Sequence, residues 1–269
     1  MKFFQNRPGR LRALQILLIL ATSLTLFGWL AYTPPGLLGK ADAVGYAVCH
    51  RIAGRSFMIG DRQVPLCARC SGMYLGALLG MVYLAGFGRK GGLPPLKTAW
   101  VFIVFLLAFA IDGGNSYLHF FPGAPELYPP ENWLRLITGT GVGLGIAVVL
   151  VPVVHQSFWR EVDPQPALNS WRRLLPLLAL AALIDLMVWS ENPLLLFPLA
   201  VLSSAGVLAI LTLVYTIVWT MIVKQDNHFQ SVRQLWMALL AGFFTALLQI
   251  AVIDAGRFWF TGSWGGFNL

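Results

Sequence analysis

The sequence predicts an all-α protein, a polytopic membrane bundle of about seven transmembrane helices. Hydrophobic residues make up 57% of its 269 residues and charged residues only 11%, whereas charged residues form about a quarter of an ordinary soluble domain. The mean hydropathy is +0.70. These values exclude a soluble globular domain. The net charge of +8 does not indicate a nucleic-acid partner, because the basic residues collect between apolar segments, as they do in the loops of membrane proteins.

Each apolar segment is a candidate span, and membrane lipids are the first expected partners. In chain order the predicted spans are 11–32, 70–88, 98–117, 133–153, 174–190, 197–223 and 234–254. The first span follows basic residues, as a secretory signal does, but its apolar run is about twice as long as that of a signal. We therefore expect it to remain as an anchor.

Lysine and arginine are unevenly distributed between the two sides. With the N-terminus inside, twelve of the nineteen basic residues lie in inner segments and seven in outer ones. The positive-inside rule thus predicts a cell-membrane protein with a cytoplasmic N-terminus. Five of the seven outer residues belong to one loop: Lys40, Arg51, Arg55, Arg62 and Arg69. Topogenic charge does not explain these arginines, so we expect the loop to have a function.

Polar loops divide the chain into two regions. Residues 1–153 form an N-terminal membrane region with a Cys/Arg extracytoplasmic loop at 33–69 and a second polar loop at 112–132. Residues 154–269 supply the C-terminal transmembrane helices, in which the residues of chemical interest are Asp185 and Asp254. The chemistry is therefore expected in the first region.

All three cysteines of the chain fall in the first loop, next to a histidine: Cys49-His50 and Cys67-x-x-Cys70. Pro65 suits the start of a helix, which would place Cys67 and Cys70 on one face of its first turn. The partial positive charge of a helix N-terminus, and the neighbouring Arg69, favour the thiolate form. Thiolates of this kind ligate metals or exchange disulfides.

Three interpretations of the cysteines are open. A metal site, with zinc as the best match, would use all three and either His50 or a more distant group. A redox site would pair Cys67 with Cys70 and use Cys49 as the exchange partner, in keeping with an oxidising compartment. A structural disulfide would join Cys49 to Cys67 or Cys70 and leave one thiol free.

The arginines suggest recognition of an anion. Guanidinium groups at a membrane surface can bind phosphate or carboxylate bidentately, so Arg51, Arg55 and Arg69 are candidates for binding an anionic small molecule or lipid head group. Contact with local acids and lipid phosphates is the alternative.

A second polar group surrounds the fourth predicted span. Asp112-Gly113-Gly114 is a turn signal that we expect to end the third span, and Glu131 with Asn132 opens the fourth. Arg135 in the first turn opposes the helix dipole. We therefore expect it to pair with Asp112 or Glu131.

Glycines four residues apart let helices approach closely in lipid. They occur in the second span at Gly72, Gly76 and Gly80, and in the fourth at Gly139 and Gly143. If these ridges face each other, the cysteines and Arg135 meet at one end of a helix pair. Arg135 would then lie within about 12 Å of Cys70.

The motifs together resemble a known family. Cys49-His50-Arg51-x-x-x-Arg55-Ser56, Pro65-Leu66-Cys67-Ala68-Arg69-Cys70-Ser71-Gly72, Asp112-Gly113 and Glu131-Asn132-x-x-Arg135-x-x-x-Gly139 are similar to the prokaryotic membrane family of domain of unknown function 2085. The resemblance covers about residues 44–150. It implies a multi-pass membrane protein and no established activity.

Three functions fit these observations. The first is a binding or transport protein whose outward-facing Cys/His metal or thiol site lies beside anion-recognising arginines. The second is a membrane-embedded enzyme that uses the thiols in redox chemistry or a metal in hydrolysis. The third is a structural subunit with a disulfide-stapled loop. The sequence specifies neither the ligand nor the oligomeric state.

Overall fold

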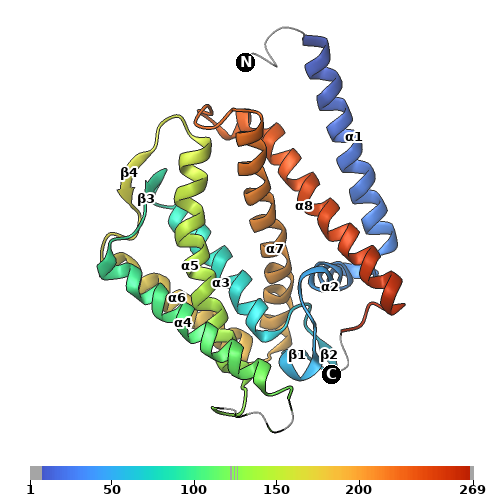
Figure 1. The fold of residues 1–269 in the computed structure, drawn as a ribbon, viewed down its shortest axis with the longest axis vertical. Helices are drawn as coiled ribbons and strands as arrows, with labels where there is room; N and C mark the ends of the chain where they lie inside the picture. Colours follow the sequence, from blue (N-terminus) through green and yellow to red (C-terminus); the bar gives the residue numbers. More distant parts are fainter. Residues whose placement is uncertain (1–7, 122, 124, 126, 267–269) are drawn as a thin grey trace.

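The computed structural model describes residues 8–121, 123, 125 and 127–266, and within them the chain is a helical bundle (Figure 1). The described residues form eight α-helices: α1 (Pro8–Tyr32), α2 (Gly36–Val48), α3 (Ala68–Ala85), α4 (Leu96–Leu118), α5 (Asn132–Phe158), α6 (Trp171–Trp189), α7 (Pro193–Ile222) and α8 (Val232–Thr261). The short strands β1 (Met58–Ile59) and β2 (Arg62–Gln63) form a hairpin, and β3 (Lys90–Gly92) pairs in parallel with β4 (Asp163–Pro166).

The predicted fold class is confirmed, since every segment predicted as a span is a helix. In the described part of the chain, six helices are long and apolar enough to cross a membrane: α1, α3, α4, α5, α7 and α8. Helix α6 is not among them. It carries three charged residues, Arg172, Arg173 and Asp185, within 19 residues, and charged side chains are costly inside a bilayer.

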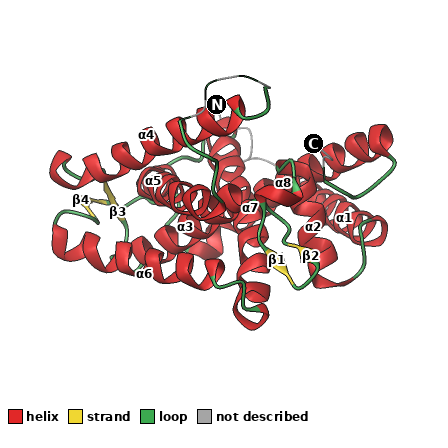
Figure 2. Cartoon of the chain, turned by 90° about the horizontal axis from the view of Figure 1, so that it is seen from below, coloured by secondary structure: helices red, strands yellow, loops and turns green. Residues whose placement is uncertain are grey.

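Helices α3 and α5 lie at the centre of one half of the bundle. Viewed from below, they lie between α4 and α6, and α7 separates them from α8, α1 and α2 (Figure 2). A buried apolar cluster holds α3, α5 and α6 together; it contains Leu84, Leu144, Ala147, Leu174 and Leu177. The arrangement makes the α3–α5 pair the element against which the other helices of this half pack.

The predicted glycine ridges face each other. A Cβ added at Gly72 would lie 2.3 Å from the Leu136 carbonyl oxygen, and one at Gly143 would lie 2.0 Å from that of Met73. A Cβ at Gly139 would lie 2.2 Å from the carbonyl oxygen of Arg69. The two backbones are therefore in direct contact, as close packing through small residues in membranes requires.

Two of the predicted loops contain helical residues. Helix α2 occupies part of the predicted loop 33–69, and its residues 41–46 are buried. Helix α4 continues through Gly113 and Gly114 to Leu118, so Asp112 lies inside a helix and not at its end. Two glycines weaken a helix by about 1 kcal/mol each, and the contacts of the buried Asn115 and Ser116 offset this cost.

The polar segments of interest gather at one end of the bundle. The β1–β2 hairpin, the end of α4, the start of α5 and the described C-terminal residues lie toward the bottom of Figure 1, whereas α5 and α7 end at the top. At the opposite end, Lys90 forms an ion pair with Asp163 that joins β3 to β4.

We predict that Gly143→Ala destabilises the protein. Its new methyl group would meet the Met73 carbonyl oxygen and force α3 and α5 apart, at a cost of about 1–3 kcal/mol. The thermal unfolding midpoint of purified protein in detergent measures this. Gly28→Ala in α1 is the matched control, because nothing lies within 4 Å of its added Cβ. An equal response of the two variants would contradict the packing argument.

Candidate functional site

The three cysteines meet at the N-terminus of α3. Cys49 is the C-cap residue of α2, Cys67 is the N-cap residue of α3, and Cys70 lies in the first turn of α3. Their sulfur atoms lie within 4.8 Å of one another. Each cysteine is a free thiol, and the backbone N–H of Cys67 donates a hydrogen bond to Cys49 Sγ at 3.3 Å. The helix starts later than predicted, so Pro65 precedes it.

Local structure brings Cys49 and Cys67 together although 18 residues separate them. The β1–β2 hairpin reverses the chain at Gly60, whose φ of +60° suits glycine. Helix α2 then packs directly on the segment that follows β2, because a Cβ at Gly45 would lie only 2.0 Å from the Pro65 carbonyl oxygen. The hairpin and this close contact position the two thiols.

The cysteine cluster is largely enclosed. Cys49 is 5% exposed, and Cys67 and Cys70 are half-buried. They pack with apolar side chains of α1, α3, α7 and α8 and of the loops beside them, which include Trp29, Leu66, Val207, Leu247 and Ile250. Arg257 of α8 donates a hydrogen bond of 2.8 Å to the Cys49 carbonyl oxygen. The site is therefore part of the bundle and not an exposed loop.

Hydrogen bonds among the three thiols shift the pKa values of Cys49 and Cys67 in opposite directions. Hydrogen bonds from the Cys67 and then the Cys70 thiol lower the pKa of Cys49 to about 2, although burial opposes this. The hydrogen bond with Cys49 raises the pKa of Cys67 to about 11. The thiolate was expected on Cys67 and Cys70, and this was wrong: both donate hydrogen bonds to Cys49, which favours the thiolate there instead.

The donor set fits a thiophilic metal ion. Zinc–sulfur bonds of about 2.3 Å in a tetrahedral site separate the sulfurs by about 3.8 Å, which the spacing within 4.8 Å allows. Among the described residues, the group of mutually close ligand atoms consists of the three sulfurs alone. His50, the predicted fourth ligand, is exposed and lies outside this group.

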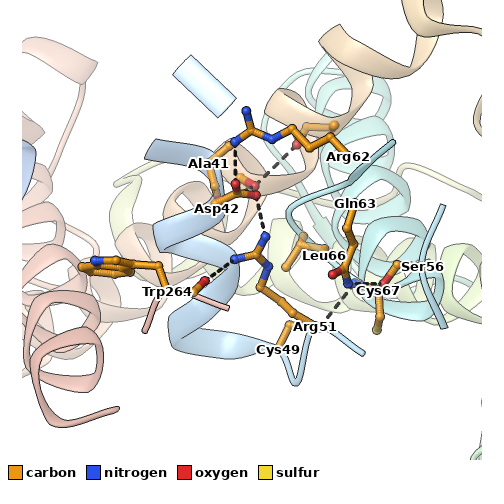
Figure 3. A network of polar contacts seen from close by, with 12 residues as sticks. Ala41, Asp42, Cys49, Arg51, Ser56, Arg62, Gln63, Leu66, Cys67 and Trp264 are labelled. Carbon is orange, nitrogen blue, oxygen red and sulfur yellow. Dashed lines mark hydrogen bonds and ion pairs between the residues drawn. The ribbon is translucent and has the colours of Figure 1, made fainter. Parts of the chain in front are cut away.

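Arg51 and Arg62 are bound to a buried carboxylate near the cysteines (Figure 3). Arg51 Nη2 lies 2.9 Å from Asp42 Oδ1, and Arg62 Nη2 lies 2.6 Å from Asp42 Oδ2. Arg51 also donates to the Trp264 carbonyl oxygen at 3.1 Å. Burial lowers the pKa of Arg51, and the Asp42 charge opposes that effect. Arg51, predicted as an anion ligand, therefore joins α2 to the C-terminal segment through these two contacts.

The other predicted arginines form a separate group on α3, α5 and the loop. Arg69 forms an ion pair with Asp112 and donates to Ser116 Oγ at 3.2 Å. Arg135 donates to Ser116 Oγ from Nε and Nη2, both at 3.4 Å. Arg55 Nη2 donates to the Ser116 carbonyl oxygen at 2.9 Å. We name Arg55, Arg69 and Arg135 the arginine triad.

The expected ion pair of Arg135 was assigned to the wrong arginine. Asp112 pairs with Arg69, which approaches from α3, and Arg135 Nη1 instead donates to Asn132 Oδ1 at 2.9 Å. Glu131 is the exposed N-cap residue of α5.

Sequence reasoning missed three residues that organise the arginine triad. Ser116 accepts hydrogen bonds from all three arginines, and Tyr128 Oη donates to Asp112 Oδ1 at 3.2 Å. Asn115 donates to the Tyr128 carbonyl oxygen at 2.8 Å. The available signal was a pair of adjacent polar residues in an apolar helix, where unpaired polar groups are costly.

We predict that Asp112→Asn destabilises the protein by about 3–5 kcal/mol, because it leaves the guanidinium of Arg69 without its carboxylate. The Asp112 side chain is 1% exposed and that of Arg69 is 21% exposed, so water replaces the lost partner only in part. Equilibrium unfolding in detergent measures the loss. Asp61→Asn, at the exposed tip of the hairpin, should change stability by less than about 0.5 kcal/mol; similar losses in both variants would contradict this reading.

The similarity of this chain to known proteins falls in the region that contains both clusters. A family model described as "Predicted membrane protein (DUF2085)" matches residues 49–149, which include the three cysteines, Asp112 and Arg135. An uncharacterized protein of Methanocaldococcus jannaschii is 30% identical over 119 residues, 44% of this chain and 71% of that relative.

A second relative is also similar to part of this chain. An uncharacterized protein of Methanothermobacter thermautotrophicus is 33% identical over 112 residues, 40% of this chain and 88% of that relative. No solved structure matches the chain. With both site clusters inside the matched region, the chain belongs to the DUF2085 family of predicted membrane proteins.

Proposed function

We propose that this protein is a cell-membrane binding protein in which Cys49, Cys67 and Cys70 hold a thiophilic metal ion, with zinc as the best match. Arginines at the same end of the bundle recognise an anionic group. The observation that carries the proposal is the mutual approach of the three sulfurs to within 4.8 Å. The N-terminus is cytoplasmic and the cysteine cluster faces outward, as the distribution of basic residues favours.

The convergence of all three sulfurs favours a metal over a dithiol or a disulfide. A structural disulfide uses two sulfurs and leaves the third idle, and a redox site uses them two at a time, whereas a metal ion engages all three at once, as their mutual approach allows. Three thiolates and one further position form a common zinc coordination shell. The hydrogen bonds that Cys67 N–H gives to Cys49 Sγ and Arg257 gives to the Cys49 carbonyl would orient the ligand, as outer-shell contacts do at metal sites.

We predict about one equivalent of zinc in protein purified without chelators, lost in Cys67→Ser and in Cys70→Ser. The double variant should lose no more, because the two residues act in one site. Elemental analysis of the purified protein measures the metal. Ser71→Ala is the matched control, since it changes a neighbouring buried residue that is not a ligand, and it should retain zinc.

Other outcomes would replace the metal proposal. Metal-free protein with a reversible two-electron thiol couple would assign the cysteines to redox chemistry. Metal-free protein with one permanent disulfide would assign them a structural role.

The orientation has its own test. In intact cells, a membrane-impermeant maleimide should label Asp61→Cys, at the hairpin tip, and should label Gln165→Cys only after permeabilisation. Both positions are exposed. Asp61 lies in the β1–β2 turn and Gln165 in β4, and these elements lie toward opposite ends of the bundle (Figure 1). The native cysteines, which are buried or half-buried, give the background. The reverse pattern would place the cysteine cluster in the cytoplasm, a reducing compartment.

A further inference from the structure

Three guanidinium groups converge on one serine at the end of the bundle. Arg55 comes from the loop, Arg69 from the first turn of α3 and Arg135 from the first turn of α5. All three donate hydrogen bonds to Ser116, to its hydroxyl or its carbonyl oxygen. Like charges repel at such short range, so something must offset the repulsion.

The described residues supply too little negative charge for this group. In the described part of the chain, the ion pair of the arginine triad is the one between Arg69 and Asp112. Arg55 and Arg135 bind neutral oxygens, although Arg135 is only 5% exposed. Glu131, the next acid, is exposed to solvent. A buried guanidinium without a carboxylate is costly, and an anion from solution or lipid would remove that cost.

Two helix N-termini add to the positive field. Arg69 and Arg135 lie in the first turns of α3 and α5, which are 18 and 27 residues long. The caps Cys67 and Glu131 make no side-chain capping hydrogen bond within the described structure, so the first N–H groups retain their partial positive charge. Anions bind at such helix ends.

Two arginines of the same loop that lie outside the arginine triad do have a carboxylate partner. Arg51 and Arg62 share the Asp42 carboxylate, with one guanidinium on each oxygen. The Asp42 carboxylate therefore offsets their charge, with distances of 2.9 and 2.6 Å between guanidinium nitrogen and carboxylate oxygen. The arginine triad differs because two of its three members have no carboxylate partner among the described residues.

We infer that Arg55, Arg69 and Arg135 form a binding site for a phosphate group, carried by inorganic phosphate or by a phospholipid head group. The inference deepens the proposed function by naming the site and the class of anion. A carboxylate is satisfied by one bidentate guanidinium, whereas a phosphate offers more oxygens and more charge to several. The rings of Phe120, 3.7 Å from Arg55, and Phe109, 5.3 Å from Arg69, hold two of the guanidiniums in place.

The test measures phosphate binding to the purified full-length protein. Titration calorimetry and thermal unfolding are run in neutral detergent with inorganic phosphate, with chloride at equal ionic strength as reference. A second arm uses nanodiscs that contain phosphatidic acid or only phosphatidylcholine. Phosphate should raise the unfolding midpoint by mass action and chloride should not. A response to inorganic phosphate identifies a free anion, and a response to phosphatidic acid alone identifies a lipid head group.

Variants assign the response to the arginine triad. Arg135→Gln and Arg55→Gln should each weaken binding by about tenfold or more. Arg62→Gln, in the same loop but bound to Asp42, should bind as the unaltered protein does. If Arg135→Gln does not fold, Arg55→Gln decides, because Arg55 is only half-buried.

The outcomes separate this inference from the metal proposal. Zinc is measured in every sample, and the arginine variants should retain it. Zinc without phosphate binding in either arm would overturn the arginine site alone, whereas phosphate binding without zinc would overturn the metal centre alone. An equal loss of binding in Arg62→Gln would also overturn the assignment, because it would show a general charge effect.

Discussion

The close packing of α3 on α5 is the constraint on which the rest of the structure depends. Gly72, Gly139 and Gly143 place backbone against backbone, and in lipid this contact is stabilised by van der Waals packing, since the hydrophobic effect does not drive helices together there. The contact also fixes the relative position of the two helix N-termini. Arg69 and Arg135 therefore lie near the same serine of α4.

Both clusters use the start of α3 but need different partners. The cysteine cluster is completed by the end of α2, which the contact between Gly45 and Pro65 holds against the segment between β2 and α3. The arginine triad is completed by α4 and α5. A change at the first turn of α3 would therefore reach both, which makes the residues from Cys67 to Cys70 the structural link between the thiols and the charges.

The positive charges of the loop are divided by the fold. Asp42 on α2 takes Arg51 and Arg62, and the contact of Arg51 with Trp264 ties the C-terminal segment to this pair. Asp112 takes Arg69. The first group is neutralised more fully and has a structural role, whereas the second retains positive charge next to two helix N-termini, where an anion is stabilised.

The sequence by itself determined the fold class, the positions of the seven helices predicted as spans and the glycine ridges, because hydropathy and small-residue spacing are local signals that act along one helix. It also marked Cys49, Cys67 and Cys70, whose spacing is visible in the chain. Only the tertiary structure decided which carboxylate meets which arginine, that His50 lies outside the sulfur group, and that α2 packs as a helix within the first loop. Those outcomes depend on distances between helices, which periodicity along a single helix does not contain.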